Sequence, residues 1–211
     1  RLNAPLEVKK AFQFLHSTDP RTKRDGEGYI PSDQLFVFSP DSQKIFFKKA
    51  KRFTRSEMMV MDMLSTNDWK RPIYFAVTIG NDYHLGLDPY LELTGMAYRI
   101  TPERSKDGRP RVNTEVMYDN MLNKFKYGNM HVPGIYIDEN TMRMCRTHRM
   151  MFLDLIEALY QEGKYDKCLE VLDFAEQVLP GYNISYDYTS ASMAVYYYQL
   201  GEMAKANAIM A

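Results

Sequence analysis

Residues Phe152 to Leu169 read FLDLIEALYQEGKYDKCL, two apolar-rich segments separated by a single glycine. The apolar side chains recur at intervals of three and four residues, which is the spacing that places them on one face of a helix. Gly163 marks the break between the segments, because Gly is a typical helix stop. The stretch therefore predicts two antiparallel helices joined by a tight turn.

A related pattern returns before the chain ends. Gly201 stands 38 positions after Gly163 in a similar apolar context. Helical pairs that recur about every 34 residues are typical of tetratricopeptide repeats. We therefore expect tetratricopeptide-like antiparallel helical hairpins over residues 141–211, with a slightly longer link between the pairs. The pattern stops at Ala211 inside a helix-like segment, so we expect the sequence to be an excised piece of a longer protein. Two repeats are fewer than the usual minimum of about three, so they should either pack on the mixed α/β part or continue past Ala211.

The first 53 residues carry shorter signals. Residues 5–15 have apolar side chains at helical spacing behind a proline and predict a short amphipathic helix. Residues 17–28 are polar and punctuated by Gly and Pro, which predicts a loop. Residues 34–38 and 44–48 are strand-like and are separated by a Ser-Pro-Asp-Ser turn, so we expect a hairpin.

A helix and a strand are expected next. Thr54 and Glu57 fit a capping box ahead of a helix that runs to about Ser65. Residues 73–80 form a nearly unbroken apolar and β-branched run. Such a run is typical of a strand covered on both faces, and we expect it to be the central strand of a small sheet.

The pattern then changes from strands to helices. A strand is expected over residues 95–100, and Asn113 should cap a helix over residues 114–126. After about residue 138 only helical patterns remain. The chain is therefore predicted to be of the α+β class, with a small mixed α/β layer over residues 1–140 followed by the helical hairpins of residues 141–211.

Charge and cysteine usage narrow the classes of partner. The 211 residues contain 27 Lys and Arg against 27 Asp and Glu, so the formal net charge is zero and no nucleic-acid partner is expected. No apolar run approaches the roughly 18 to 20 residues that span a bilayer, so we expect this fragment to be soluble. Cys145 and Cys168 should lie about 20 Å apart along the predicted hairpin, too far for a disulfide.

One loop has the composition of a possible reaction site. The sequence contains no GxxxxGK[ST], GxGxxG, HExxH or GxSxG motif and no paired CxxC, so it predicts neither a cofactor nor a metal site. Asp82 and Asp88 flank His84 after the predicted central strand, where α/β layers commonly bind ligands. A loop that only reverses the chain uses the same residue types. Both interpretations stay open.

Two further polar groups are candidates for binding. Asn67, Trp69 and Arg71 place the only Trp beside hydrogen-bonding side chains, a combination typical of sugar recognition. The alternative is a Trp that caps the core with a cation stacked on it. Asp119 and Asn120 belong to a polar helix face that either binds a ligand or is simply solvated.

Ordered sequence blocks in the middle of the chain resemble a known family. The blocks are NDWKRPIYFAVTIG from Asn67, LTGMAYR from Leu93, MYDNM from Met117 and PGIYIDEN from Pro133. Over about residues 54–165 they are similar to the C-terminal soluble part of a polytopic bacterial membrane-protein family of unknown function. The N-terminal membrane region of that family resembles protein O-mannosyltransferases, which use lipid-linked sugars. The resemblance implies a periplasmic location and carries no catalytic residue onto this chain.

Three functions are compatible with these observations. The resemblance implies a non-catalytic periplasmic domain of a membrane glycosyltransferase-like protein, which positions an acceptor polypeptide or glycan. Its first partner would be the membrane-embedded N-terminal part of the same protein. One alternative is a docking module whose helical repeats hold another protein. The other is an enzyme domain that uses Asp82, His84 and Asp88, so whether the chain is an enzyme stays open.

Overall fold

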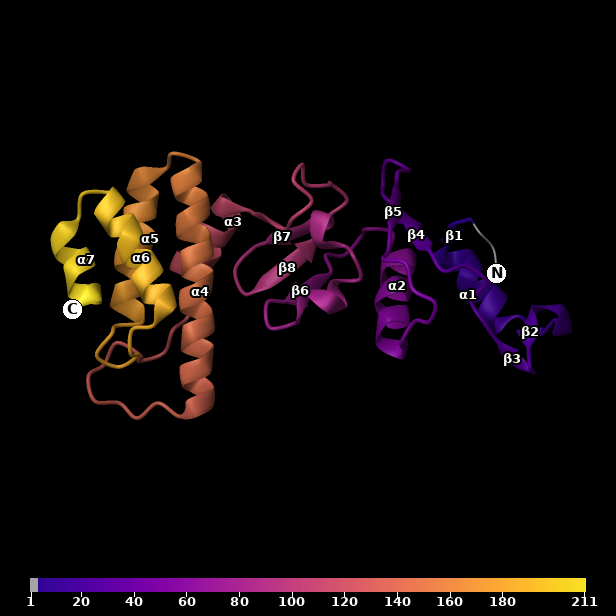
Figure 1. Cartoon of the computed structure of the whole chain (residues 1–211), viewed down its shortest axis with the longest axis horizontal. Helices are drawn as coiled ribbons and strands as arrows, with labels where there is room; N and C mark the ends of the chain where they lie inside the picture. The colour runs from indigo at the N-terminus through magenta and orange to yellow at the C-terminus, as the bar shows by residue number, and fades with distance from the viewer. Residues whose placement is uncertain (1–3) are drawn as a thin grey trace. The chain divides into compact units, whose positions relative to one another are not determined.

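The computed structural model describes residues 4–211, which form two compact units (Figure 1). The first unit comprises residues up to 92 together with residues 97–111, and the second comprises residues 93–96 and 112–211. Small sheets with two helices make up most of the first unit, and helices dominate the second, so the predicted α+β class is confirmed. Residues 112–140 pack with the later helices, and the domain boundary expected after residue 140 stays a prediction.

The first unit opens with a three-stranded sheet of order β1-β4-β5. Its strands are β1 (Leu6–Glu7), β4 (Leu35–Phe38) and β5 (Lys44–Phe46). The antiparallel pairing of β4 with β5 confirms the expected hairpin. The predicted first helix begins later than expected, as α1 (Val8–His16), because the preceding two residues pair in parallel with β4.

The segment predicted as a loop over residues 17–28 contains regular structure. A 3-10 turn (Pro20–Thr22) leads into a two-stranded antiparallel ribbon of β2 (Lys23–Arg24) and β3 (Glu27–Gly28). Asp25 and Gly26 connect the two strands, both with positive φ. Asp and Gly tolerate that conformation, which is the one that tight hairpin turns require.

Helix α2 (Arg55–Asn67) begins with the predicted capping box. The Glu57 backbone N–H donates to Thr54 Oγ1 at 3.3 Å, and the Thr54 N–H donates to Glu57 Oε2 at 2.7 Å. Met61 and Leu64 then face the core of the first unit. The rest of that core comes from the first helix and the hairpin, chiefly Val8, Ala11, Leu35, Val37 and Ile45.

The expectation of a central strand over residues 73–80 is wrong. The second sheet has the order β6-β8-β7-β9, built from β6 (Tyr74–Ala76), β7 (Leu91–Leu93), β8 (Ala97–Ile100) and β9 (Arg111–Val112). β6 is a three-residue edge strand in which Phe75 is buried while Tyr74 is 49% exposed. The chain turns immediately afterwards, where the Ile79 N–H donates to the Ala76 carbonyl at 3.0 Å. Only one side of this strand is therefore buried, and the rest of the apolar run lies outside the sheet.

The predicted helix after Asn113 is present but changes type. The Asn113 side chain accepts the Val116 N–H at 3.0 Å and caps α3 (Thr114–Tyr118), and a π-helical segment continues over Asp119–Lys124. Gly95, with φ of 134°, lies against the ring of Phe125 just beyond that segment. A Cβ atom on Gly95 would stand 2.9 Å from this ring, so only Gly permits the approach.

Four helices complete the second unit (Figure 1). They are α4 (Glu139–Gln161), α5 (Tyr165–Val178), α6 (Tyr188–Gln199) and α7 (Met203–Met210). Gly163 and Gly201 adopt positive φ between the members of each pair, at the positions predicted for the turns. The paired helices are therefore confirmed, while their membership of the tetratricopeptide class stays a prediction.

Two buried features hold this unit together. Arg149 on α4 is 1% exposed and donates to the carbonyls of Leu179 and Ile184, each at 2.9 Å, and of Ser185 at 3.1 Å. It thereby fixes the link between α5 and α6. The two cysteines are buried free thiols, as predicted. Among the described helices, none combines the length and apolar composition that crossing a bilayer requires.

Candidate functional site

The loop after β6 packs closely against Lys48, which lies two residues after the end of β5. It contains a 3-10 turn (Asn81–His84), after which Leu85 and Gly86 both have positive φ. The Lys48 N–H donates to the Leu85 carbonyl at 2.7 Å. A Cβ atom on Gly86 would meet the Lys48 backbone nitrogen at 3.1 Å, so the close approach of the two segments favours Gly at this position.

His84 points into the interior of the first unit. Its side chain is 1% exposed, and its Nδ1 lies 2.9 Å from Asp88 Oδ1. The imidazole stacks on Phe75 with ring centroids 5.3 Å apart, and the edge of Tyr98 lies on another side at 5.6 Å. The Nε2 atom has no hydrogen-bond partner among the described residues. Of the two aspartates that flank His84 in the sequence, Asp88 thus contacts its ring, which lies under aromatic cover.

The Asp82 side chain makes no hydrogen bond to His84 or Asp88 in the described part of the chain. Its backbone instead helps to anchor the loop. The Asp82 carbonyl accepts a hydrogen bond from Lys48 Nζ at 2.9 Å. The same ammonium group lies 3.0 Å from Glu57 Oε1. Although burial opposes ionisation of Glu57, hydrogen bonds from the Thr54 N–H and from Lys48 lower the pKa of its carboxyl group. Lys48 thus ties the start of α2 to the loop.

The outer side of the same loop borders a groove, here called the Tyr83 groove, with a volume of about 420 Å³. Tyr83 is 65% exposed on its rim. The other lining residues are Ser56, Glu57, Val60, Phe75, Thr78, Ile79, Gly80 and Leu85. Neighbouring residues of one turn thus face opposite ways, with His84 inside and Tyr83 outside. Tyr83 was not among the residues predicted from the sequence, because its exposure beside a buried His84 depends on segments that are distant in the chain.

The predicted group around Trp69 is a local turn. Asn67 Nδ2 donates to the Arg71 carbonyl at 2.6 Å, and the Arg71 N–H returns a bond to Asn67 Oδ1 at 3.2 Å. Trp69 is half-buried against the core and its Nε1 donates to the Phe38 carbonyl at 2.8 Å. The structure brings the three residues together, and these contacts match the interpretation of the Trp as a cap on the core.

Asp119 and Asn120 belong to the second unit and make local contacts. Asp119 pairs with Lys124 at 2.6 Å and accepts a bond from Asn123 at 3.0 Å. Asn120 Nδ2 donates to the Thr94 carbonyl at 2.7 Å. These bonds hold the π-helical segment against residues 93–96. Over residues 4–211 the structure has no group of three or more His, Cys, Asp or Glu side chains arranged for a metal ion.

The middle of the chain also matches a known family model. Residues 29–120 match TMEM260-associated domain 2. This segment is therefore similar to a domain found in a family of uncharacterised membrane-associated proteins, and it includes every residue of the Tyr83 groove. No curated protein and no solved structure matches the chain.

Proposed function

We propose that this chain is a non-catalytic, periplasmic binding domain of a membrane glycosyltransferase-like protein, and that it positions an acceptor polypeptide or glycan for the membrane-embedded part of that protein. The similarity of residues 29–120 to TMEM260-associated domain 2 supports the association with a membrane protein. The resemblance of the sequence blocks described above supports the glycosyltransferase-like partner and the periplasmic side.

The Tyr83 groove is the observation that carries the proposal. Its volume of about 420 Å³ falls within the range of roughly 300 to 1,000 Å³ that is usual for ligand sites. The exposed ring of Tyr83 offers an apolar face together with a hydroxyl group, which suits the C–H face of a sugar or a peptide side chain. Glu57 supplies an ionised acceptor at the rim, held in place by Lys48.

The position of His84 supports binding over catalysis. A general base must come within hydrogen-bond reach of the proton that it removes. His84 Nδ1 is paired with Asp88, and Nε2, which has no hydrogen-bond partner among the described residues, belongs to a ring that is 1% exposed beside Phe75 and Tyr98. Phe75 also lines the groove, so His84 supports the groove from beneath. The enzyme alternative would require this ring to become accessible.

The test combines a binding assay with an activity assay. Amide resonances of the isotope-labelled chain are followed during titration with acceptor-like peptides and oligosaccharides, and the shifts should concentrate on residues 78–85. Tyr83→Ala should remove them, while Tyr136→Ala, at a tyrosine that is 92% exposed outside the groove, should not. Unaided transfer or hydrolysis of a lipid-linked sugar that disappears in His84→Gln would overturn the proposal and favour the enzyme.

A second function, the docking of another protein, is favoured by one observation on the last two helices. Val195 on α6 and Met203 and Met210 on α7 are exposed, the two helices pack against each other, and exposed apolar surface is a feature of interaction sites. A combined variant with Ser at Val195 and Gln at both methionines should lose a partner captured from cell envelopes by the parent chain. Identical captures by both proteins would contradict this function.

A further inference from the structure

A second cavity in the first unit shares no lining residue with the Tyr83 groove. It is a basin of about 1020 Å³ between the β4–β5 turn and the loop that follows β8. Three acidic and three basic side chains line it, so its formal charge is balanced: Asp41, Glu103, Asp107, Arg104, Lys106 and Arg111. This charged basin is not part of the site described above.

Several of these charged groups are fixed in place before any ligand arrives. Asp41 accepts hydrogen bonds from the Ser39 hydroxyl and, at 2.6 Å, from Gln43 Nε2. Arg111 Nε lies 3.1 Å from Glu92 Oε1, and its Nη1 lies 3.2 Å from Glu103 Oε2. Preorganised polar groups lose less entropy on binding, so they are suited to recognition.

The two carboxylates outside these ion pairs remain ionised. The Ser39 hydroxyl lowers the pKa of the Asp41 carboxyl group, and the Arg109 N–H lowers that of Asp107, whose Oδ1 accepts it at 3.1 Å. Both side chains therefore act only as acceptors at neutral pH. Arg104 and Lys106 are exposed and make no hydrogen bond or ion pair with the described residues, so their donors are available.

A mixed set of this kind suits hydroxyl groups, which donate and accept at the same time. A polyanion would meet three carboxylates and a polycation three cations, so neither is favoured. We propose that the basin binds a neutral oligosaccharide, with Arg104 and Lys106 as donors and Asp41 and Asp107 as acceptors. The volume of about 1020 Å³ is slightly above the usual range of roughly 300 to 1,000 Å³ for ligand pockets, which leaves room for several sugar rings. Pro40 and Pro102 add apolar surface for C–H groups.

This inference rests on the proposed function. That function allows either a polypeptide or a glycan as the acceptor, and the basin is proposed to bind the glycan. The experiment titrates the labelled chain with cellotetraose and mannotetraose, and separately with inorganic phosphate. At least one oligosaccharide should shift the amide resonances of residues 41–43 and 103–107. Its Kd should hardly change with added salt, because screening weakens only interactions between net charges. Shifts produced by phosphate alone, with strong salt dependence, would overturn the proposal in favour of an anion site.

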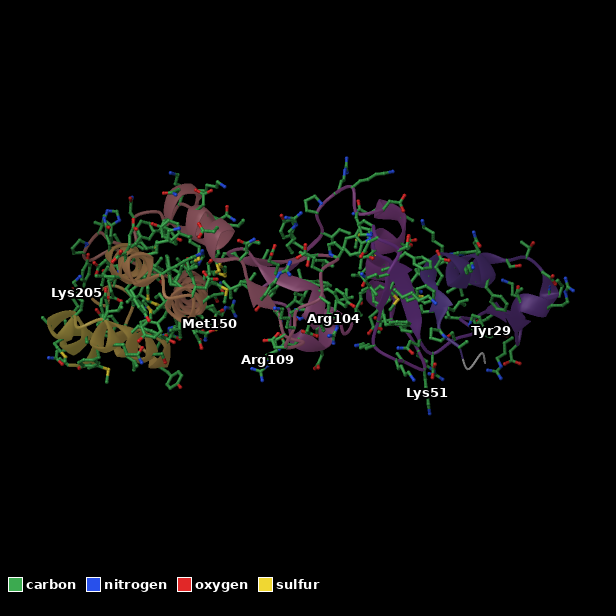
Figure 2. All side chains as sticks on the ribbon, turned by 90° about the horizontal axis from the view of Figure 1, so that it is seen from above. Tyr29, Lys51, Arg104, Arg109, Met150 and Lys205 are labelled. Atoms are coloured by element: carbon green, nitrogen blue, oxygen red, sulfur yellow. The ribbon has the colours of Figure 1, made fainter. Side chains whose placement is uncertain are left out.

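A matched pair of variants tests the geometry. Arg104→Ala should raise Kd for the oligosaccharide about tenfold, the effect of losing one charge-assisted hydrogen bond. Arg109 belongs to the same loop, but it does not line the basin and its side chain extends outward from the ribbon (Figure 2). Arg109→Ala should therefore leave Kd unchanged. Equal effects of the two substitutions, with unchanged thermal unfolding, would contradict a specific site.

The outcomes separate this inference from the proposed function. Oligosaccharide shifts confined to the Tyr83 groove would overturn the basin and leave the proposed function standing. Shifts in the basin together with unaided glycosyl transfer by the chain would support the basin and overturn the non-catalytic role. If neither oligosaccharide shifts resonances in the Tyr83 groove or in the charged basin, the proposal that the basin binds an oligosaccharide is wrong. The titration with acceptor-like peptides would then decide the proposed function.

Discussion

Lys48 and Glu57 form an ion pair, with Nζ 3.0 Å from Oε1, that joins the segment after β5 to the first turn of α2. The same ammonium group reaches the carbonyl of Asp82 at 2.9 Å. One side chain thereby sets the distance between the two borders of the Tyr83 groove. The groove is consequently sensitive to a residue that does not line it.

Replacing Lys48 by Met should loosen the groove with little loss of stability. Lys48 is partly exposed, so the ion pair contributes only about 0.5 kcal/mol to the free energy of unfolding. Hydrogen exchange of the amides of residues 82–85 should accelerate, because the anchor of the loop is removed. Lys49→Met is the matched control, and equal exchange rates in both variants would contradict the anchoring role.

Asp154 should destabilise the second unit at neutral pH. Burial, with a contribution from nearby Glu157, raises the pKa of its carboxyl group to about 6. Because the folded-state pKa lies above that of the unfolded chain, the contribution of Asp154 to stability is most favourable below pH ~4 and is lost as the pH rises through about 6. Asp154→Asn should therefore raise the free energy of unfolding by on the order of 1 to 3 kcal/mol at pH 7.

Urea denaturation at pH 7 and at pH 4 measures this effect. The gain from Asp154→Asn should be largest at pH 7 and nearly vanish at pH 4. Glu157→Gln, on the same helix at an exposed position, should give a much smaller gain. A gain that does not depend on pH would show that ionisation of Asp154 is not its cause.

Arg149 should be intolerant of replacement by Lys as well as by Ala. Its guanidinium donates to three carbonyls of the α5–α6 link, and an ammonium group cannot reproduce that planar fork. Arg149→Ala should cost about 3 to 5 kcal/mol, since it removes charge-assisted bonds and leaves buried carbonyls unpaired. Thermal unfolding compared with Arg146→Ala, at an exposed position on the same helix, measures the difference, and equal melting temperatures would refute the role.

Gly95 should be among the least replaceable glycines. Ala at this position combines an unfavourable φ of 134° with a contact of 2.9 Å to the Phe125 ring, and the expected cost is roughly 2 to 3 kcal/mol. Gly134 also has positive φ but faces open space, so Gly134→Ala should cost only about 1 kcal/mol. Unfolding free energies from denaturant titration compare the two. A larger loss at Gly134 would contradict the importance of the ring contact.

Features made by neighbours in the chain were predictable. The capping box of Thr54 and Glu57, the cap at Asn113 and the turns at Gly163 and Gly201 appear where the sequence patterns place them. Each depends on hydrogen bonds or backbone angles within a few residues, so no distant part of the chain has to be known. The hairpin of β4 and β5 follows the same logic, because its strands are joined by a short turn.

Features made by distant segments were not predictable in this way. The apolar run after residue 72 became an edge strand, since β8 pairs with one side of it and the chain turns away at once. His84 became buried and Tyr83 exposed because Phe75, Tyr98 and the Lys48 segment approach the loop from other parts of the sequence. The sequence shows which side chains are apolar and how they are spaced. Long-range packing decides which of them become buried, and it also places a groove beside Tyr83.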